Sequence, residues 1–195
     1  MATQLKQVIS AAKINTPFIL VAHSIGGMHA RVFNDMFPKL LSGIVLVDAT
    51  PYGSDEWAYA EMSKVQPEDT EDYLSFKKQF IQRLEDPNTN TEMLNVLESV
   101  NQADNSQDFG NKPLAIIQRT IQYGTEYAPP FIPKDTVTRW DNVYRDSEHV
   151  FTSLSTNSHF IRSLSKSHFL QRPTEDLEGT LKALDWIIEQ LKKGN

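Results

Sequence analysis

The sequence predicts an α/β fold with a mostly parallel sheet flanked by helices, and three patterns lead to this prediction. Residues 18–21, 44–47 and 113–118 form almost entirely apolar runs, which is typical of strands buried on both faces of a sheet. Segments with apolar residues at helical spacing stand between these runs. The first two runs are joined through a helix by short links, as in a right-handed βαβ unit.

The first elements follow from local signals. Apolar residues recur at helical spacing over 4–13, which predicts a short amphipathic helix. After the strand at 18–21, a second helix carries apolar residues from Met28 to Phe37, and Pro38 marks its end. The run 44–47 is then the next strand of the sheet.

The middle and the end of the chain differ in composition from its beginning. Charged and amide residues dominate 52–111, and apolar residues recur there every three or four positions, which predicts two or three amphipathic helices and no strand. We expect a helical segment over 136–154 and a short fourth strand at 159–164. Thr174 is expected to cap a last amphipathic helix that ends near Lys193.

Composition excludes several classes of function. The 195 residues carry a net charge of −6 and show no basic stripe, so we expect neither nucleic acid nor an anionic membrane surface as a partner. The absence of cysteine excludes disulfides, thiolate metal sites and a cysteine nucleophile. No apolar run approaches the roughly 20 residues of a membrane-spanning helix. The first residues do not form a signal peptide, and we expect a cytoplasmic protein.

The stretch Ala22-His23-Ser24-Ile25-Gly26 joins the first strand to the second helix. A junction this tight needs small residues two positions before and two positions after the turn residue, because larger side chains would collide. The turn would lift the Ser24 hydroxyl above the sheet and set it at a helix N-terminus, where developing negative charge is favoured. We expect the same turn to point His23 away from the site.

This stretch resembles the nucleophile elbow of the α/β-hydrolases, written G-x-S-x-G, with alanine in place of the first glycine. The resemblance implies an α/β-hydrolase core made of residues 1–51 and 112–195, with 52–111 inserted as a helical cap. It also implies that the core is incomplete at its N-terminus, since the family has further strands before the nucleophile strand. Phe18–Val21 would then be an open sheet edge, so we expect a truncated product or a second chain that covers this edge by self-association.

A serine nucleophile needs a base, and the chain has five histidines. His168 lies in a loop after the last predicted strand and before the last helix, which is the ligand-facing edge of such a sheet. The order of serine, acid and then histidine along the chain fits the family, and Ser-Lys-Ser-His-Phe-Leu is similar to its histidine segment. We therefore predict His168 as the base.

The third member should be a carboxylate that orients the imidazole. Family members usually carry it after the strand that follows the cap, but no acid stands directly there. A minority carry it one strand earlier, where Asp48 ends the run 44–47. We predict Asp48 and leave Glu126, Asp135 and Asp141 as alternatives.

The resemblance further implies that the Ile25 N–H binds the oxyanion, while the second donor normally comes from the part of the fold before the nucleophile. It implies a serine hydrolase with a small-molecule acyl substrate, a carboxylic ester first, with a thioester or an amide as alternatives. No metal or organic cofactor is implied. Two other functions stay open: acyl transfer to an acceptor other than water, and a non-catalytic remnant that binds a ligand or partner.

Overall fold

The computed structural model describes residues 1–51, 53–120 and 128–194. The chain divides into two compact units. The first consists of Met1–Thr50, Ala103–Thr120 and Glu148–Asn195, and the second of Pro51–Gln102 and Ile121–Ser147.

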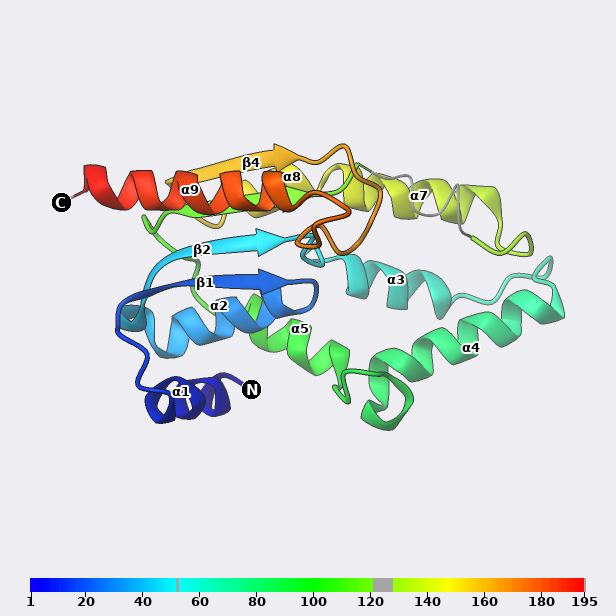
Figure 1. Ribbon diagram of the computed structural model, residues 1–195. Coiled ribbons are helices and arrows are strands. Elements are labelled where there is room, and N and C mark those ends of the chain that lie inside the picture. The colour runs from blue at the N-terminus through cyan, green and yellow to red at the C-terminus, as the bar shows by residue number, and fades with distance from the viewer. Residues whose placement is uncertain (52, 121–127, 195) are drawn as a thin grey trace. The chain divides into compact units, whose positions relative to one another are not determined.

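The first unit contains a sheet in which all strands are parallel, as the apolar runs predict (Figure 1). Its order follows the chain: β1 (Phe18–His23), β2 (Leu41–Val47), β3 (Leu114–Gln118) and β4 (Ser158–Arg162). The carboxyl ends of the strands therefore meet at one edge of the sheet, and the loops that follow them can converge there.

Helices cover both faces of this sheet. Val45 and Val47 of β2 belong to a fully buried cluster with Ala183 and Ile187 of α9 (Leu177–Lys193). The alternate residues of β2 point to the opposite face, where Leu46 lies close to α2 (Gly26–Met36). The first unit also contains α1 (Ala2–Ala11), a 3-10 turn at Pro38–Leu40 and most of α8 (Ser147–Thr152).

Two helix boundaries differ from the sequence prediction. The cap of α9 is Asp176, whose side chain accepts a hydrogen bond from the Gly179 N–H at 3.0 Å, so Thr174 is not the capping residue. Asp176 is held there because the Ser163 hydroxyl, from the loop after β4, donates to the same carboxylate. The helical segment predicted over 136–154 is broken at Asp146 into α7 (Lys134–Arg145) and α8.

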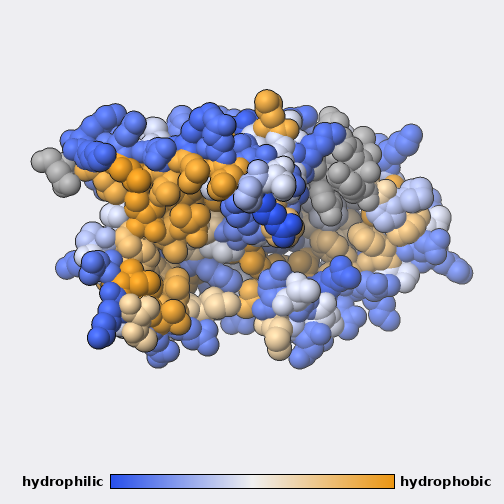
Figure 2. All heavy atoms as spheres, viewed as in Figure 1, coloured by the Kyte–Doolittle hydropathy of each residue, from blue (hydrophilic) through white to orange (hydrophobic). Residues whose placement is uncertain are grey.

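Strand β1 lies at one edge of the described sheet and pairs only with β2 among the described strands. Val21 on this strand is 50% exposed. Figure 2 shows apolar side chains gathered on the face of the first unit between α9 and α1, over β1. Self-association through this edge stays a prediction.

The second unit is built from helices: α3 (Ser54–Met62), α4 (Glu71–Glu85), α7 and most of α5 (Val96–Asp104). Met62, Tyr73, Ile132 and Val137 form its buried apolar cluster. Contacts in this cluster explain why the described residues 128–147 join this unit, although the sequence analysis placed them in the core. The role of this unit as a lid stays a prediction, and no described helix has the length and apolarity needed to cross a bilayer.

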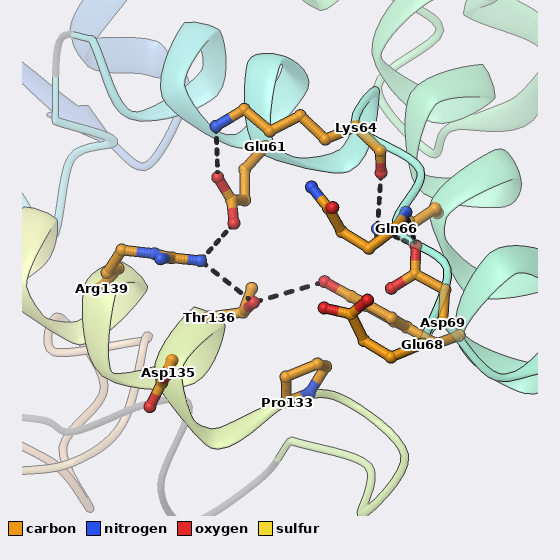
Figure 3. A pocket seen from close by; sticks show the side chains of 11 residues that line it. Glu61, Lys64, Gln66, Glu68, Asp69, Pro133, Asp135, Thr136 and Arg139 are labelled. Atoms are coloured by element: carbon orange, nitrogen blue, oxygen red, sulfur yellow. Dashed lines mark hydrogen bonds and ion pairs between the residues drawn. The ribbon is translucent and has the colours of Figure 1, made fainter.

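A polar cavity of about 360 Å³ lies within the second unit, between residues of α3, α4 and α7 (Figure 3). Several of its charged groups pair with one another: Glu61 pairs with Lys64 and Arg139. Asp69 and Lys77 form a buried ion pair at 2.7 Å, and the Lys77 ammonium also donates to the Lys64 carbonyl at 2.6 Å. This network joins the helices by charge-assisted hydrogen bonds.

Candidate active site

Ser24 occupies the sharp turn between β1 and α2. Its φ of 56° lies in the left-handed region, which costs a residue with a side chain on the order of 1 kcal/mol. Hydrogen bonds hold the turn in place: the Ser24 N–H donates to the Val47 carbonyl at 3.1 Å, and the Ser24 carbonyl accepts from Gly27 at 3.1 Å and Thr50 at 3.3 Å. The end of β2 thus fixes the serine above the sheet.

Small residues surround this turn, but the tightest contact is not the one that the sequence suggests. A Cβ on Gly26 would lie 3.8 Å from the Ala22 Cβ, which is ordinary contact. A Cβ on Gly27 would lie 2.8 Å from the Cβ of Ala49, a fully buried residue. The position at which only glycine fits is therefore Gly27, where α2 crosses the end of β2.

His168 is carried by a loop that three alternating serines organise. Ser163, Ser165 and Ser167 each accept, through the side-chain oxygen, a hydrogen bond from the backbone N–H two residues farther on, at 3.0 to 3.1 Å. Such side-chain turns fix a loop without secondary structure. The prediction of His168 used two of these serines only as part of a resemblance, and it did not use the turns that their alternation indicates.

This loop crosses the carboxyl edge of the sheet. It begins at β4, which is three strand spacings, or roughly 14 Å, from β1. On the way, the Thr120 N–H donates to the Ser165 carbonyl at 3.2 Å, which ties the loop to the end of β3. Leu170 is fully buried in the core cluster and anchors its far side. The crossing brings His168 beside Ser24.

Ser24, His168 and Asp48 lie together in the first unit. His168 Nε2 is 2.9 Å from Ser24 Oγ, and His168 Nδ1 is 2.5 Å from Asp48 Oδ2. A carboxylate can only accept, so Nδ1 carries the proton and the Nε2 lone pair faces the serine hydroxyl. The Asp48 side chain is 2% exposed and that of His168 is 34% exposed, so the imidazole remains open to solvent while the acid is buried.

Arg119 is a member of this site that the sequence analysis missed. The backbone N–H of Arg119 donates to Asp48 Oδ1 at 3.2 Å, and the side-chain Nε of Arg119 is 3.2 Å from Asp48 Oδ2. Arg119 directly follows β3, so a charged residue at the end of a buried strand was the available signal. The guanidinium compensates the buried carboxylate, which leaves Asp48 with a hydrogen-bond or ion-pair partner on both oxygens.

The three acids that the sequence left as alternatives to Asp48 do not lie beside His168 among the described residues of the first unit. Glu126 lies outside the described residues. Asp135 and Asp141 are on α7 in the second unit, the first exposed and the second buried. Within the first unit, the carboxylate that hydrogen-bonds His168 is Asp48.

The expectation that His23 points away from the site is wrong. The His23 ring centroid is 4.4 Å from that of His168, and His23 Nε2 is 2.7 Å from the His168 carbonyl oxygen. The sequence could not reveal this, because the loop that meets His23 arrives from the opposite edge of the sheet. Burial lowers the pKa of His23 below its ordinary value, although the hydrogen bond to the His168 carbonyl opposes the shift.

Ile25, the predicted oxyanion donor, is the N-cap of α2. Its N–H donates to no group among the described residues, as expected for the first turn of a helix. The described residues include no group of three or more His, Cys, Asp or Glu arranged to hold a metal ion.

No family model matches the chain, and no curated protein matches it. Among solved structures, VinJ gives a TM-score of 0.50 at 14% identity, over 96% of this chain and 71% of VinJ. A monoacylglycerol lipase from Paleococcus ferrophilus gives 0.48 at 13% identity, over 96% and 74%. A candidate lipase from Acinetobacter baumannii AYE gives 0.40 at 16% identity, over 83% and 58%, so this chain spans less than two thirds of that protein.

The sheet order, the helices on both faces of the sheet and the serine turn after β1 are all parts of one known architecture. The likeness to VinJ extends over nearly the whole chain. We conclude that this chain has the α/β-hydrolase fold.

Proposed function

We propose that the chain is a serine hydrolase that acts on a carboxylic ester or a related acyl substrate. The observation that carries the proposal is the hydrogen-bonded series from Ser24 Oγ through the His168 imidazole to the Asp48 carboxylate, at 2.9 and 2.5 Å. A nucleophile within hydrogen-bond reach of a base, with the base oriented by a third group, is the arrangement that covalent acyl transfer needs.

The chemistry assigned to these residues has two halves. His168 Nε2 takes the proton as Ser24 Oγ attacks the acyl carbon, and the resulting imidazolium then gives that proton to the departing alkoxide. In the second half His168 takes a proton from water as the water oxygen attacks the acyl carbon. The imidazolium then gives that proton to Ser24 Oγ as the bond between Oγ and the acyl carbon breaks, which releases the acid and restores the serine. Asp48 keeps Nε2 as the acceptor and stabilises the imidazolium in both halves.

The negative oxygen of the tetrahedral intermediate is assigned to the Ile25 N–H. This donor is unused among the described residues and stands at the N-terminus of α2, where the helix dipole favours negative charge. One such donor contributes a factor of about 10²–10³ to turnover. The acyl class of substrate follows from this donor beside an activated hydroxyl.

The test is hydrolysis of p-nitrophenyl acetate together with labelling by a fluorophosphonate, which reacts only with an activated hydroxyl. Ser24→Ala should abolish labelling and lower turnover by at least about 10³-fold. Ser10→Ala is the matched control, because Ser10 is an exposed serine on α1, and it should behave as the wild type. Equal turnover by the Ser24 variant would refute the nucleophile.

The acid is tested separately. Asp48→Asn should lower turnover by about 10³–10⁴-fold, since an amide would favour the wrong imidazole tautomer. Asp135→Asn, which changes an exposed aspartate of α7, should leave turnover unchanged. The opposite pattern would assign the acid to α7. A folded wild-type chain that neither hydrolyses nor labels would favour the non-catalytic function.

A further inference from the structure

We propose that His23 is a positioning residue for His168, which acts by holding the main chain of the base; this inference rests on the proposed function. His23 is the last residue of β1 and directly precedes Ser24. The strand that carries the nucleophile therefore also forms a hydrogen bond to the loop that carries the base. The distance between the two reacting groups is thereby set by one short segment of chain.

The contacts of the loop divide into two sets. On the side of β4, the alternating serines fix the backbone N–H groups as far as Phe169. On the side of β1, the contact is the hydrogen bond of 2.7 Å from His23 Nε2 to the His168 carbonyl. The His23 ring also lies against both aromatic rings, with centroids 4.4 Å from His168 and 5.5 Å from Phe169. Without His23, the main chain at His168 would lose its hydrogen bond to β1.

The protonation state of His23 matters for this role. A carbonyl only accepts, so the neutral His23 ring must carry its proton on Nε2. Burial lowers the pKa of His23, and the positive charge of Arg119 lowers it further, as does that of His168 when His168 is protonated. The hydrogen bond to the His168 carbonyl and the Asp48 carboxylate raise this pKa, but burial is the largest effect. His23 is therefore neutral at pH 7, so it places no like charge beside the imidazolium that His168 becomes during the reaction.

Two substitutions separate the hydrogen bond from the ring packing. His23→Phe keeps an aromatic ring but removes the donor, whereas His23→Gln keeps an N–H donor at a similar reach. We expect His23→Phe to lower kcat about 10-fold with KM changed less than about 2-fold, because the base is misplaced while the substrate pocket is kept. His23→Gln should recover kcat to within about 3-fold of the wild type.

The pH profile gives a second readout that a purely structural role would not move. In the wild type, the acid limb of kcat/KM should steepen from one proton to two at low pH, because a protonated His23 places a positive charge beside the imidazolium that the reaction must form and so lowers activity by itself. In His23→Phe the limb should keep the slope of one proton. His149→Gln is the control, since His149 is exposed on α8, and it should change neither kcat nor the slope.

The outcomes are distinct. Wild-type kcat in His23→Phe, or equal losses in the phenylalanine and glutamine variants, would overturn the proposal. If the wild type itself is inactive, the proposed function fails, and imidazole ¹H–¹⁵N spectra of the wild type test the hydrogen bond alone. Those spectra should show His23 protonated on Nε2 at pH 7, and the Nδ1-protonated form would overturn it.

Discussion

Replacement of Gly27 by alanine should destabilise the junction between α2 and β2. The new Cβ would lie 2.8 Å from the Ala49 Cβ, at least about 0.7 Å closer than carbon atoms normally approach. Ala49 is fully buried and cannot rotate away, so the backbone must move. Overpacking of this kind costs about 1–3 kcal/mol, which the better helix propensity of alanine offsets by up to about 1 kcal/mol.

The expected net loss is about 1–2 kcal/mol, which corresponds to a fall in Tm of about 2–8 °C for a chain of this size. Gly26→Ala, at the preceding position of the same helix, is the matched control. Its new Cβ would lie 3.8 Å from the Ala22 Cβ, which is ordinary contact, so this variant should be neutral or slightly stabilising. Thermal unfolding followed by circular dichroism measures both. Equal Tm values for the two variants would refute the steric argument.

The remaining predictions concern charge in the second unit. Burial raises the pKa of Asp55 from 3.8 to about 6, so the folded chain binds this proton more tightly, and the resulting stabilisation is full below pH 3.8 and lost as pH rises through 6. Asp55→Asn should therefore raise the free energy of unfolding by up to about 3 kcal/mol at pH 8 and change it little at pH 4. Urea titrations at the two pH values measure this difference. An equal rise in the free energy of unfolding at pH 4 and pH 8 would contradict the raised pKa of Asp55. Lys77→Met should cost about 3–5 kcal/mol, because it leaves the Asp69 carboxylate buried without its cation. The double variant Lys77→Met/Asp69→Leu should recover most of that loss in the same titrations, and a single-variant cost below about 1 kcal/mol would show that the pair is not effectively buried.

Much of the fold could be predicted from local patterns. Uninterrupted apolar runs identified β1, β2 and β3, because strands of a parallel sheet are buried on both faces. Ser24 and Asp48 follow the ends of two of these runs, and they were predicted from the elbow motif and from the family resemblance. Helix ends were predicted less well. Thr174 fits the local rule for an N-cap, but Asp176 caps α9. The hydroxyl of Ser163, in the loop after β4, holds the Asp176 carboxylate in place, and a rule based on neighbouring residues does not include that contact.

The missed members of the site have a common cause. His23 ends β1 and Arg119 directly follows β3, yet the contacts of each depend on which other segments meet it at the sheet edge. The same cause explains the glycine at the elbow. The sequence analysis expected the tight contact two residues after Ser24, at Gly26, but it lies at Gly27, because Ala49, which follows β2, packs against that position.

The sequence by itself determined the order of strands and helices, the serine at the sharp turn and the histidine in the loop before the last helix. The strands, the helices and the sharp turn follow from spacing and side-chain size within a few residues of chain, whereas the histidine was predicted from its place after the last strand and from the family resemblance. The tertiary structure alone decided that the loop carrying His168 crosses from β4 to β1, and that it meets His23, Asp48 and Arg119 there. Packing across the sheet edge joins segments more than a hundred residues apart, and no local pattern encodes that distance.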